Sequence, residues 1–222
     1  MSSISSKHTP PAEARALEMI RQAYAKKAYL FFEENKYDLN IGGIRNKTTE
    51  PDRFDDSFFV AFVDGRSTWR VAMWSCTTDP GLYFLNSEKM GNRSGTAVLI
   101  PDQYRRCWKI GKHGKNKYPA LVQNGMPFKV WRDHNKDGSL DRSGKVYDDV
   151  TGLNCHKAYE WGEGEVIGKN KWISNWSAGC QVSEVSYAHD YILMPLAEKQ
   201  VEKGAGSTFT YTLFDSKDFS DM

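Results

Sequence analysis

The chain has 222 residues, of which 40% are hydrophobic and 26% are charged, and its formal net charge is +2. This length suits one domain of ordinary size with a small appendage, and the hydrophobic fraction is sufficient for a sizeable core. The near balance of basic and acidic residues gives no reason to expect a nucleic-acid partner. No apolar run approaches the ~20 residues that span a bilayer, so we expect no membrane partner.

The N-terminal part reads as an arm followed by a helix. Residues 1–11 are rich in Ser and Pro, and from Ala12 to about Asn35 apolar residues recur at helical spacing: Leu17, Ile20, Tyr24, Ala28 and Phe31. Two interpretations remain open: a helix that packs on the domain and closes one end of it, or a docking helix for a larger assembly. We therefore predict an arm and packing helix over residues 1–50 and the main domain over residues 51–222.

A series of short strand-like runs follows. Phe58–Val63 leads into Asp64-Gly65, and residues 68–75 return, which predicts a hairpin with a tight two-residue turn. Gly, Pro and Asn punctuate the later runs: Leu82–Asn86, Thr96–Ile100, Arg106–Ile110, Tyr118–Gln123 and Phe128–Trp131. This rhythm predicts a mainly β fold, either a β-sandwich or a barrel-like sheet.

The C-terminal part combines a helix and a closing strand. Residues 184–203 carry a helical pattern that Pro195 should kink or restart. Thr208–Phe214 reads as the last strand, and Asp215–Met222 as a frayed acidic tail. The fold should therefore have an N-terminal helix and one helix near the C-terminus.

Four cysteines allow two disulfides, but we expect four free thiols: Cys76, Cys107, Cys155 and Cys180. The N-terminal residues lack the charged and apolar regions of a secretory signal, which favours synthesis in the cytoplasm, where thiols stay reduced.

The acidic segment Asp133–Asp141 matches the first part of a calcium-binding loop. Oxygen-bearing side chains stand at alternate positions, a glycine at the sixth and an acid at the ninth: Asp133, Asn135, Asp137, Gly138 and Asp141. Position twelve is Gly144, where such a loop needs a glutamate, and an Asx-rich turn between two strands would have the same composition. A structural calcium ion is one prediction for this segment, and a simple turn is the other.

The segment from Gly152 to Val182 holds the strongest candidates for catalytic residues. His156 ends an alternating run in which Asn154 and His156 share one face while Leu153 and Cys155 share the other. An imidazole within reach of Cys180 would lower the pKa of its thiol and make it a nucleophile. Gly179 permits a tight turn whose amides can face the oxygen of a tetrahedral intermediate.

Two motifs resemble those of the L,D-transpeptidase catalytic domains, the YkuD-like family. Ser177-Ala178-Gly179-Cys180 is similar to the Ser-His-Gly-Cys signature, and Thr77–Phe84 is similar to the Thr-Pro-x-Gly-x-Phe strand entry. The histidine precedes the cysteine, as in the family. The matches span about residues 77–182, and the whole chain looks most like a divergent, phage-associated branch.

This resemblance implies a site and a substrate. Cys180 would attack stem peptides of peptidoglycan at the carbonyl between an L-centre and a D-centre, with His156 as general base and no required cofactor. A backbone carbonyl just after the histidine, that of Lys157 or a near neighbour, would hold its second nitrogen. Ser177 would bond within the cysteine loop or simply stabilise a turn. We expect three further residues to contact substrate: Thr78, Tyr118 and Asn154.

The sequence also departs from the family pattern. Ala178 replaces a second histidine, Val182 replaces an arginine, and His156 and Cys180 are 24 positions apart (180 − 156), with the excess expected in Glu160–Lys171. These departures favour an alternative: a non-catalytic structural virion or wall-binding module that keeps the fold.

For the enzyme, the missing signal favours hydrolysis over transpeptidation, acting on the wall after lysis or from a virion. Zinc hydrolysis is a weaker alternative, because the chain has no His-x-x-x-His or Cys-x-x-Cys pair.

Overall fold

The computed structural model describes residues 9–47, 50–86, 95–150, 152–159 and 172–220. Most of the expected N-terminal arm therefore lies outside the described residues. The elements in chain order are α1 (Pro11–Lys26), β1 (Asn40–Arg45), β2 (Asp56–Val63), β3 (Trp69–Thr77), α2 (Leu82–Asn86), β4 (Thr96–Leu99), β5 (Gln103–His113), β6 (Tyr118–Gln123), β7 (Phe128–Asp133), β8 (Tyr147–Val150), β9 (Cys155–Tyr159), β10 (Gln181–Val185), α3 (Ser186–Ala188), a π-helical turn η1 (His189–Leu193), α4 (Met194–Glu202), β11 (Thr208–Asp215) and a 3₁₀ turn η2 (Ser216–Phe219).

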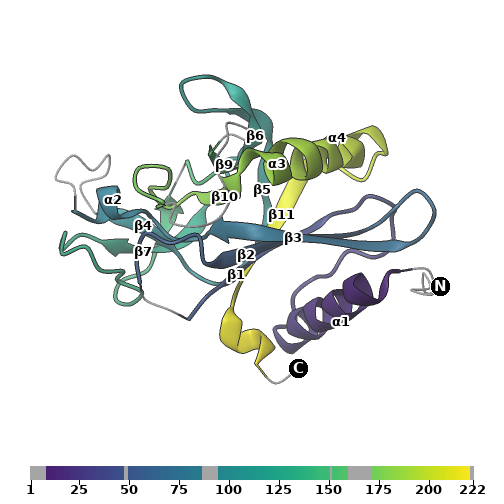
Figure 1. Ribbon diagram of the computed structural model, residues 1–222, viewed down its shortest axis with the longest axis horizontal. Coiled ribbons are helices and arrows are strands. Elements are labelled where there is room, and N and C mark those ends of the chain that lie inside the picture. Colours follow the sequence, from purple (N-terminus) through teal and green to yellow (C-terminus); the bar gives the residue numbers. More distant parts are fainter. Residues whose placement is uncertain (1–8, 48–49, 87–94, 151, 160–171, 221–222) are drawn as a thin grey trace.

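The predicted mainly β fold is confirmed, and its centre is a closed barrel with strand order β1-β11-β5-β6-β9-β10-β3-β2 (Figure 1). Two neighbouring pairs, β1 with β11 and β9 with β10, run parallel, and the other neighbours run antiparallel. Closure leaves no open sheet edge in the barrel, which satisfies backbone groups that an edge strand would expose. A separate sheet has the order β4-β7-β8.

The packing of strand β2 explains why its sequence is almost continuously apolar. Phe58, Val60 and Phe62 point into the barrel cluster, whereas the alternate residues pack on the outside, under α1. A strand buried on both faces cannot show a polar alternation. The hairpin is confirmed, but its turn is longer than two residues. The amide of Asp64 donates to the carbonyl oxygen of Thr68, and Ser67 takes a left-handed φ of 59°.

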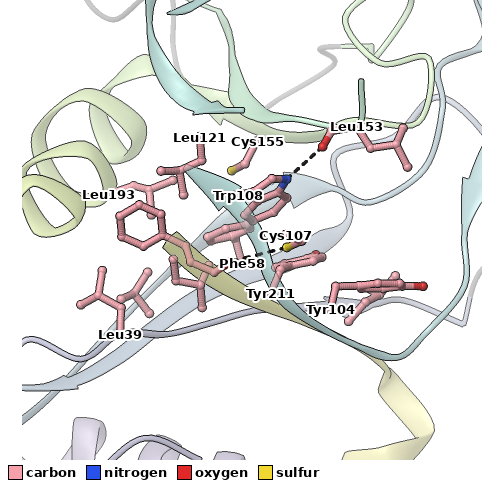
Figure 2. Packing of buried hydrophobic residues seen from close by; sticks show 14 of the residues in the cluster. Leu39, Phe58, Tyr104, Cys107, Trp108, Leu121, Leu153, Cys155, Leu193 and Tyr211 are labelled. Carbon is pink, nitrogen blue, oxygen red and sulfur yellow. Dashed lines mark hydrogen bonds between the residues drawn. The ribbon is translucent and has the colours of Figure 1, made fainter. Parts of the chain in front are cut away.

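The main core fills the barrel interior and both of its ends. Figure 2 shows aromatic rings from several strands meeting there, with the Trp108 indole donating to the carbonyl oxygen of Leu153 at 2.9 Å. The Trp108 and Tyr211 rings lie 4.6 Å apart between centroids. The separate sheet contributes to the cluster through β4 and β7, and the C-terminal helical segment contributes through Leu193 and its neighbours. The barrel wall is thus packed on its inner side by one cluster of aliphatic and aromatic side chains.

Helix α1 packs against the outside of the barrel through four buried residues: Leu17, Ile20, Ala23 and Tyr24. It ends earlier than the periodicity predicts, because Ala28 adopts a left-handed φ of 54° and the next residues have no regular secondary structure. The segment 1–50 also contains β1, which is a barrel strand, so the domain boundary expected near residue 50 does not separate the helix from the barrel.

Two further expectations about local structure are corrected. Leu82–Asn86 forms the helical turn α2 and is not a strand, since β3 already ends at Thr77, the carboxylate of Asp52 accepts from the Leu82 amide, and the carbonyl oxygen of Gly81 accepts from the amides of Phe84 and Leu85. Residues 215–220 are not frayed: Asp215 and Asp218 form a capping box around η2, and Lys27 pairs with the buried Asp218 at 2.9 Å. The C-terminal helical pattern is confirmed as α3, η1 and α4 in succession, with Pro195 in the first turn of α4.

Arg45 is fully buried and binds the segment that directly follows β3. The Arg45 guanidinium donates to the hydroxyl and carbonyl oxygens of Thr78 and to the carbonyl oxygen of Leu99, at 2.7–2.9 Å. It also lies 3.2 Å from the carboxylate of Asp79, which binds Arg142 on its other oxygen. This network connects β1, the end of β3, the separate sheet and the segment after β7.

We predict that Arg45→Met destabilises the protein by about 3 to 5 kcal/mol, because it leaves one oxygen of the Asp79 carboxylate and two carbonyl oxygens buried without the guanidinium that they face. Urea unfolding followed by tryptophan fluorescence measures the change. The matched control is Lys129→Met, which removes an exposed ion pair with Asp102 and should cost at most about 1 kcal/mol. Equal losses in both variants would contradict the structural importance assigned to Arg45.

Candidate active site

The parallel pairing of β9 with β10 brings the histidine strand beside the cysteine loop. Val182 lies opposite His156 in this register, and the amide of Gln181 donates to the carbonyl oxygen of Asn154 at 2.9 Å. Cys155 points into the barrel cluster, so His156 faces out of the barrel, as the alternation predicts. Two segments that are distant in sequence thus meet at one point on the outer wall.

The tautomer of His156 follows from its hydrogen bond. Its Nδ1 lies 2.9 Å from the carbonyl oxygen of Lys157, the group expected to hold it, and a carbonyl only accepts hydrogen bonds. Nδ1 therefore carries the proton, and Nε2 keeps a lone pair that can accept one. The residue is 2% exposed. Burial and the neighbouring His113 lower the pKa of His156 to about 3, so the imidazole is neutral near pH 7.

The Cys180 thiol is held by backbone groups. Its Sγ accepts from the amide of Asn154 at 3.4 Å and donates to the carbonyl oxygen of Gly152 at 3.6 Å. Within the described residues, no imidazole is among its hydrogen-bond partners. The expectation of a lowered thiol pKa is wrong for this state, because burial raises the pKa of Cys180 to about 11 against a small opposing effect of the Asn154 amide.

The turn before the cysteine is built by Ser177 and Gly179. Gly179 has φ 119°, and a Cβ there would lie 2.6 Å from the carbonyl oxygen of Ala97, so glycine is required. The Ser177 hydroxyl donates to the carbonyl oxygen of Cys180 and accepts from the amide of Gly179. Ser177 thus stabilises the turn, and the Gly179 amide is not free to bind an oxyanion in this state.

The three expected substrate contacts differ in their placement. Tyr118 lies at the site, with its hydroxyl 3.3 Å from both His156 Nδ1 and the carbonyl oxygen of Lys157. The Asn154 side chain also lies at the site. Its Oδ1 accepts from the backbone amide of Gln123, and its Nδ2 contacts Nδ1 of His113. Thr78 is fully buried, and its hydroxyl is bonded to Asp56 and Arg45. It supports the end of β3 and does not line a groove.

His113 was missed as a site residue. It ends β5 opposite Tyr118 in the β5–β6 hairpin, and its ring stacks on that of His156 with centroids 4.0 Å apart. The sequence signal was the predicted strand at Tyr118–Gln123, because a hairpin partner of Tyr118 must lie a few residues before it. His189, in η1, is a second missed residue, and its ring lies 6.1 Å from that of Tyr118.

The four cysteines are free, as expected. Among the residues that the structure describes, there is no group of three or more His, Cys, Asp or Glu side chains arranged to hold a metal ion. In the same part of the chain, no helix combines the length and apolar character that crossing a bilayer requires.

The acidic loop Asp133–Asp141 is closed by its own hydrogen bonds. The side-chain nitrogen of Asn135 donates to the carboxylates of Asp137 and Asp141, both at 3.1 Å. The backbone amide of Asp141 donates to the carboxylate of Asp133. Burial, with the charges of Asp141 and Asp137, raises the pKa of Asp133. These bonds are those of an Asx-rich turn, and calcium binding by the loop remains a prediction.

Comparison of the chain with known proteins gave no match to a protein-family model, to a curated protein or to a solved structure. The extra length expected between the histidine and the cysteine, Glu160–Lys171, lies outside the described residues. The resemblance to the L,D-transpeptidases therefore rests on the motif residues.

Alkylation tests the state of the thiols. Cys180 is the partly exposed cysteine and the other three are buried, so brief treatment with iodoacetamide should label Cys180 first. With a thiol pKa of about 11, its labelling rate should rise about tenfold per pH unit from pH 7 to 10. Peptide mapping gives the site and the rate. A plateau below pH 9 would show an imidazolium–thiolate pair instead.

Thermal unfolding tests the acidic loop. If the loop binds calcium in the folded state, 1 mM calcium chloride should raise the melting temperature relative to chelator, because a ligand of the folded state stabilises it by mass action. Asp137→Asn should abolish that rise, whereas Asp64→Asn, an acid in a distant turn, should keep it. Identical melting curves in calcium and chelator would leave only the turn.

Proposed function

We propose that this protein is a peptidoglycan-acting cysteine enzyme of L,D-transpeptidase type, which cleaves or exchanges L,D peptide bonds of stem peptides through a Cys180 thioester. The observation that carries the proposal is the parallel β9–β10 pairing, which sets a neutral imidazole with an unprotonated Nε2 on the strand beside the cysteine loop. The motif resemblance supplies the substrate class.

The reaction follows from a neutral thiol and a neutral imidazole. Because the pKa of Cys180 is about 11 and that of His156 is about 3, the resting pair is not ionised. The thiol leaves the carbonyl oxygen of Gly152, passes its proton to His156 Nε2 and attacks the acyl carbon in one step. The resulting imidazolium gives that proton to the departing amine, which leaves a thioester. This is general-base catalysis and not an ion-pair mechanism.

The second half-reaction decides between two enzyme classes. Water that resolves the thioester makes the protein a peptidase, and the amine of a second stem makes it a transpeptidase. In both cases His156 accepts the proton of the attacking group and returns it to Cys180. We favour water, in a phage lytic or virion-associated setting in which the enzyme reaches the wall after lysis or from the particle.

Virion proteins would then contact α1 through its polar outer face.

One observation favours the alternative of a non-catalytic virion or wall-binding module. The Cys180 thiol is bonded to backbone groups, and its pKa is raised. A thiol that never leaves these partners would be structural. The test of the proposal is therefore turnover itself.

Substitution of Cys180 and His156 measures how much each contributes to turnover. Cys180→Ala, His156→Ala and the double variant should all reduce muropeptide conversion to the same floor, at least ~10³-fold below wild type, because losses within one cooperating unit do not add. Conversion is followed by mass analysis of purified peptidoglycan digests. Cys155→Ala, on the interior face of the same strand, should lower the melting temperature and keep most of the turnover.

Two results would count against the proposal. Full turnover in Cys180→Ala would show that the nucleophile is a different residue. Wild type that converts no stem peptide across several wall chemistries would favour the non-catalytic module.

A further inference from the structure

His113 covers the proposed base. It is the last residue of β5, and its ring stacks on that of His156 at 4.0 Å between centroids and 13° between planes. His156 is buried, whereas His113 is partly exposed. The Tyr118 ring meets the edge of the His113 ring at 70°. A ligand that approaches this part of the wall therefore meets His113 before His156.

Hydrogen bonds fix which nitrogen of His113 carries its proton. The amide of Gln123 donates to Asn154 Oδ1 at 2.9 Å, which orients the Asn154 side chain. Its Nδ2 then lies 3.0 Å from His113 Nδ1. An amide nitrogen only donates, so His113 Nδ1 accepts and the proton of the neutral ring is on Nε2. Burial and the nearby His189 lower the pKa of His113, which favours this neutral form.

The two stacked rings therefore have opposite tautomers. His156 has its proton on Nδ1 and a lone pair on Nε2, whereas His113 has a lone pair on Nδ1 and its proton on Nε2. One ring can accept the thiol proton, and the other can donate a hydrogen bond. The Gly179 amide is already bonded to Ser177, so in this state that amide is not the donor for the oxygen that gains charge during acyl transfer.

We propose that His113 is a catalytic residue whose Nε2–H donates a hydrogen bond to the acyl oxygen of the substrate. The inference rests on the proposed function. As the bond from Cys180 sulfur to the acyl carbon forms, the carbonyl π pair moves onto oxygen, and the His113 donor stabilises that charge without transferring its proton. When the carbonyl re-forms and the amine leaves, the hydrogen bond weakens and His113 is unchanged.

Two substitutions separate donation from packing. His113→Phe keeps an aromatic face over His156 but has no donor, and His113→Gln supplies an amide donor without a ring. Loss of an oxyanion donor costs about 10²- to 10³-fold in kcat. We therefore expect His113→Phe to lower kcat by about that factor with little change in KM, and His113→Gln to recover part of the loss. His134→Phe, at an exposed histidine of the acidic loop, is the matched control and should match wild type.

The outcomes separate the two proposals. If wild type turns over stem peptides and His113→Phe does so equally fast, or if Phe is active and Gln is not, His113 only packs on His156 and the inference is overturned. If wild type turns over no stem peptide, the proposed function fails and the role of His113 fails with it.

A measurement on wild type guards against variants that do not fold. Long-range ¹⁵N–¹H correlation spectra of the imidazoles should show the Nε2–H tautomer for His113 and the Nδ1–H tautomer for His156 near pH 7. A proton on Nδ1 of His113 would overturn the inference without any variant.

Discussion

The parallel pairing of β9 with β10 is the constraint on which the site depends. Gln181, the first residue of β10, bonds with its amide to Asn154, with its side-chain nitrogen to the carbonyl oxygen of Gly179, and with Oε1 to the Tyr211 hydroxyl at 2.6 Å. These buried bonds fix the register of two strands that the sequence separates widely. A slip of one residue would turn His156 into the barrel and Cys155 outward, because side chains alternate along a strand.

Local patterns in the sequence predicted much of the fold. Apolar alternation and turn residues identified most strands, and they placed Asn154 and His156 on one face with Cys155 on the other. They failed where tertiary contacts decide. The run at Leu82–Asn86 has strand-like residues, but Pro80-Gly81 and the Asp52 carboxylate begin a helical turn there. Closure of the sheet into a barrel also depends on the β1–β11 pairing, which no local pattern reveals.

The candidate site was predictable only in part, for a similar reason. The motif pointed to Cys180 and His156, which stand on neighbouring segments, and to the Lys157 carbonyl, which lies 2.9 Å from His156 Nδ1. His113 reaches the site through the pairing of β5 with β6, so its role depends on a hairpin register that spacing alone does not fix. The thiol pKa depends on how deeply the loop is buried, and the hidden position of Thr78 depends on Arg45. Burial is a property of the whole packed chain.

The neighbouring positions of β1 and β11 have a consequence for the way the protein folds during synthesis. These strands are 170 positions apart in the sequence (211 − 41), yet they pair along five residues, from Ile41 with Tyr211 to Arg45 with Asp215. While the last strand is still inside the ribosome, β1 has no parallel partner and the barrel wall stays open. Pairing across such a sequence distance is slow because a long loop must close first. The nascent chain therefore exposes a sheet edge until β11 has left the ribosome, and the barrel wall closes only afterwards.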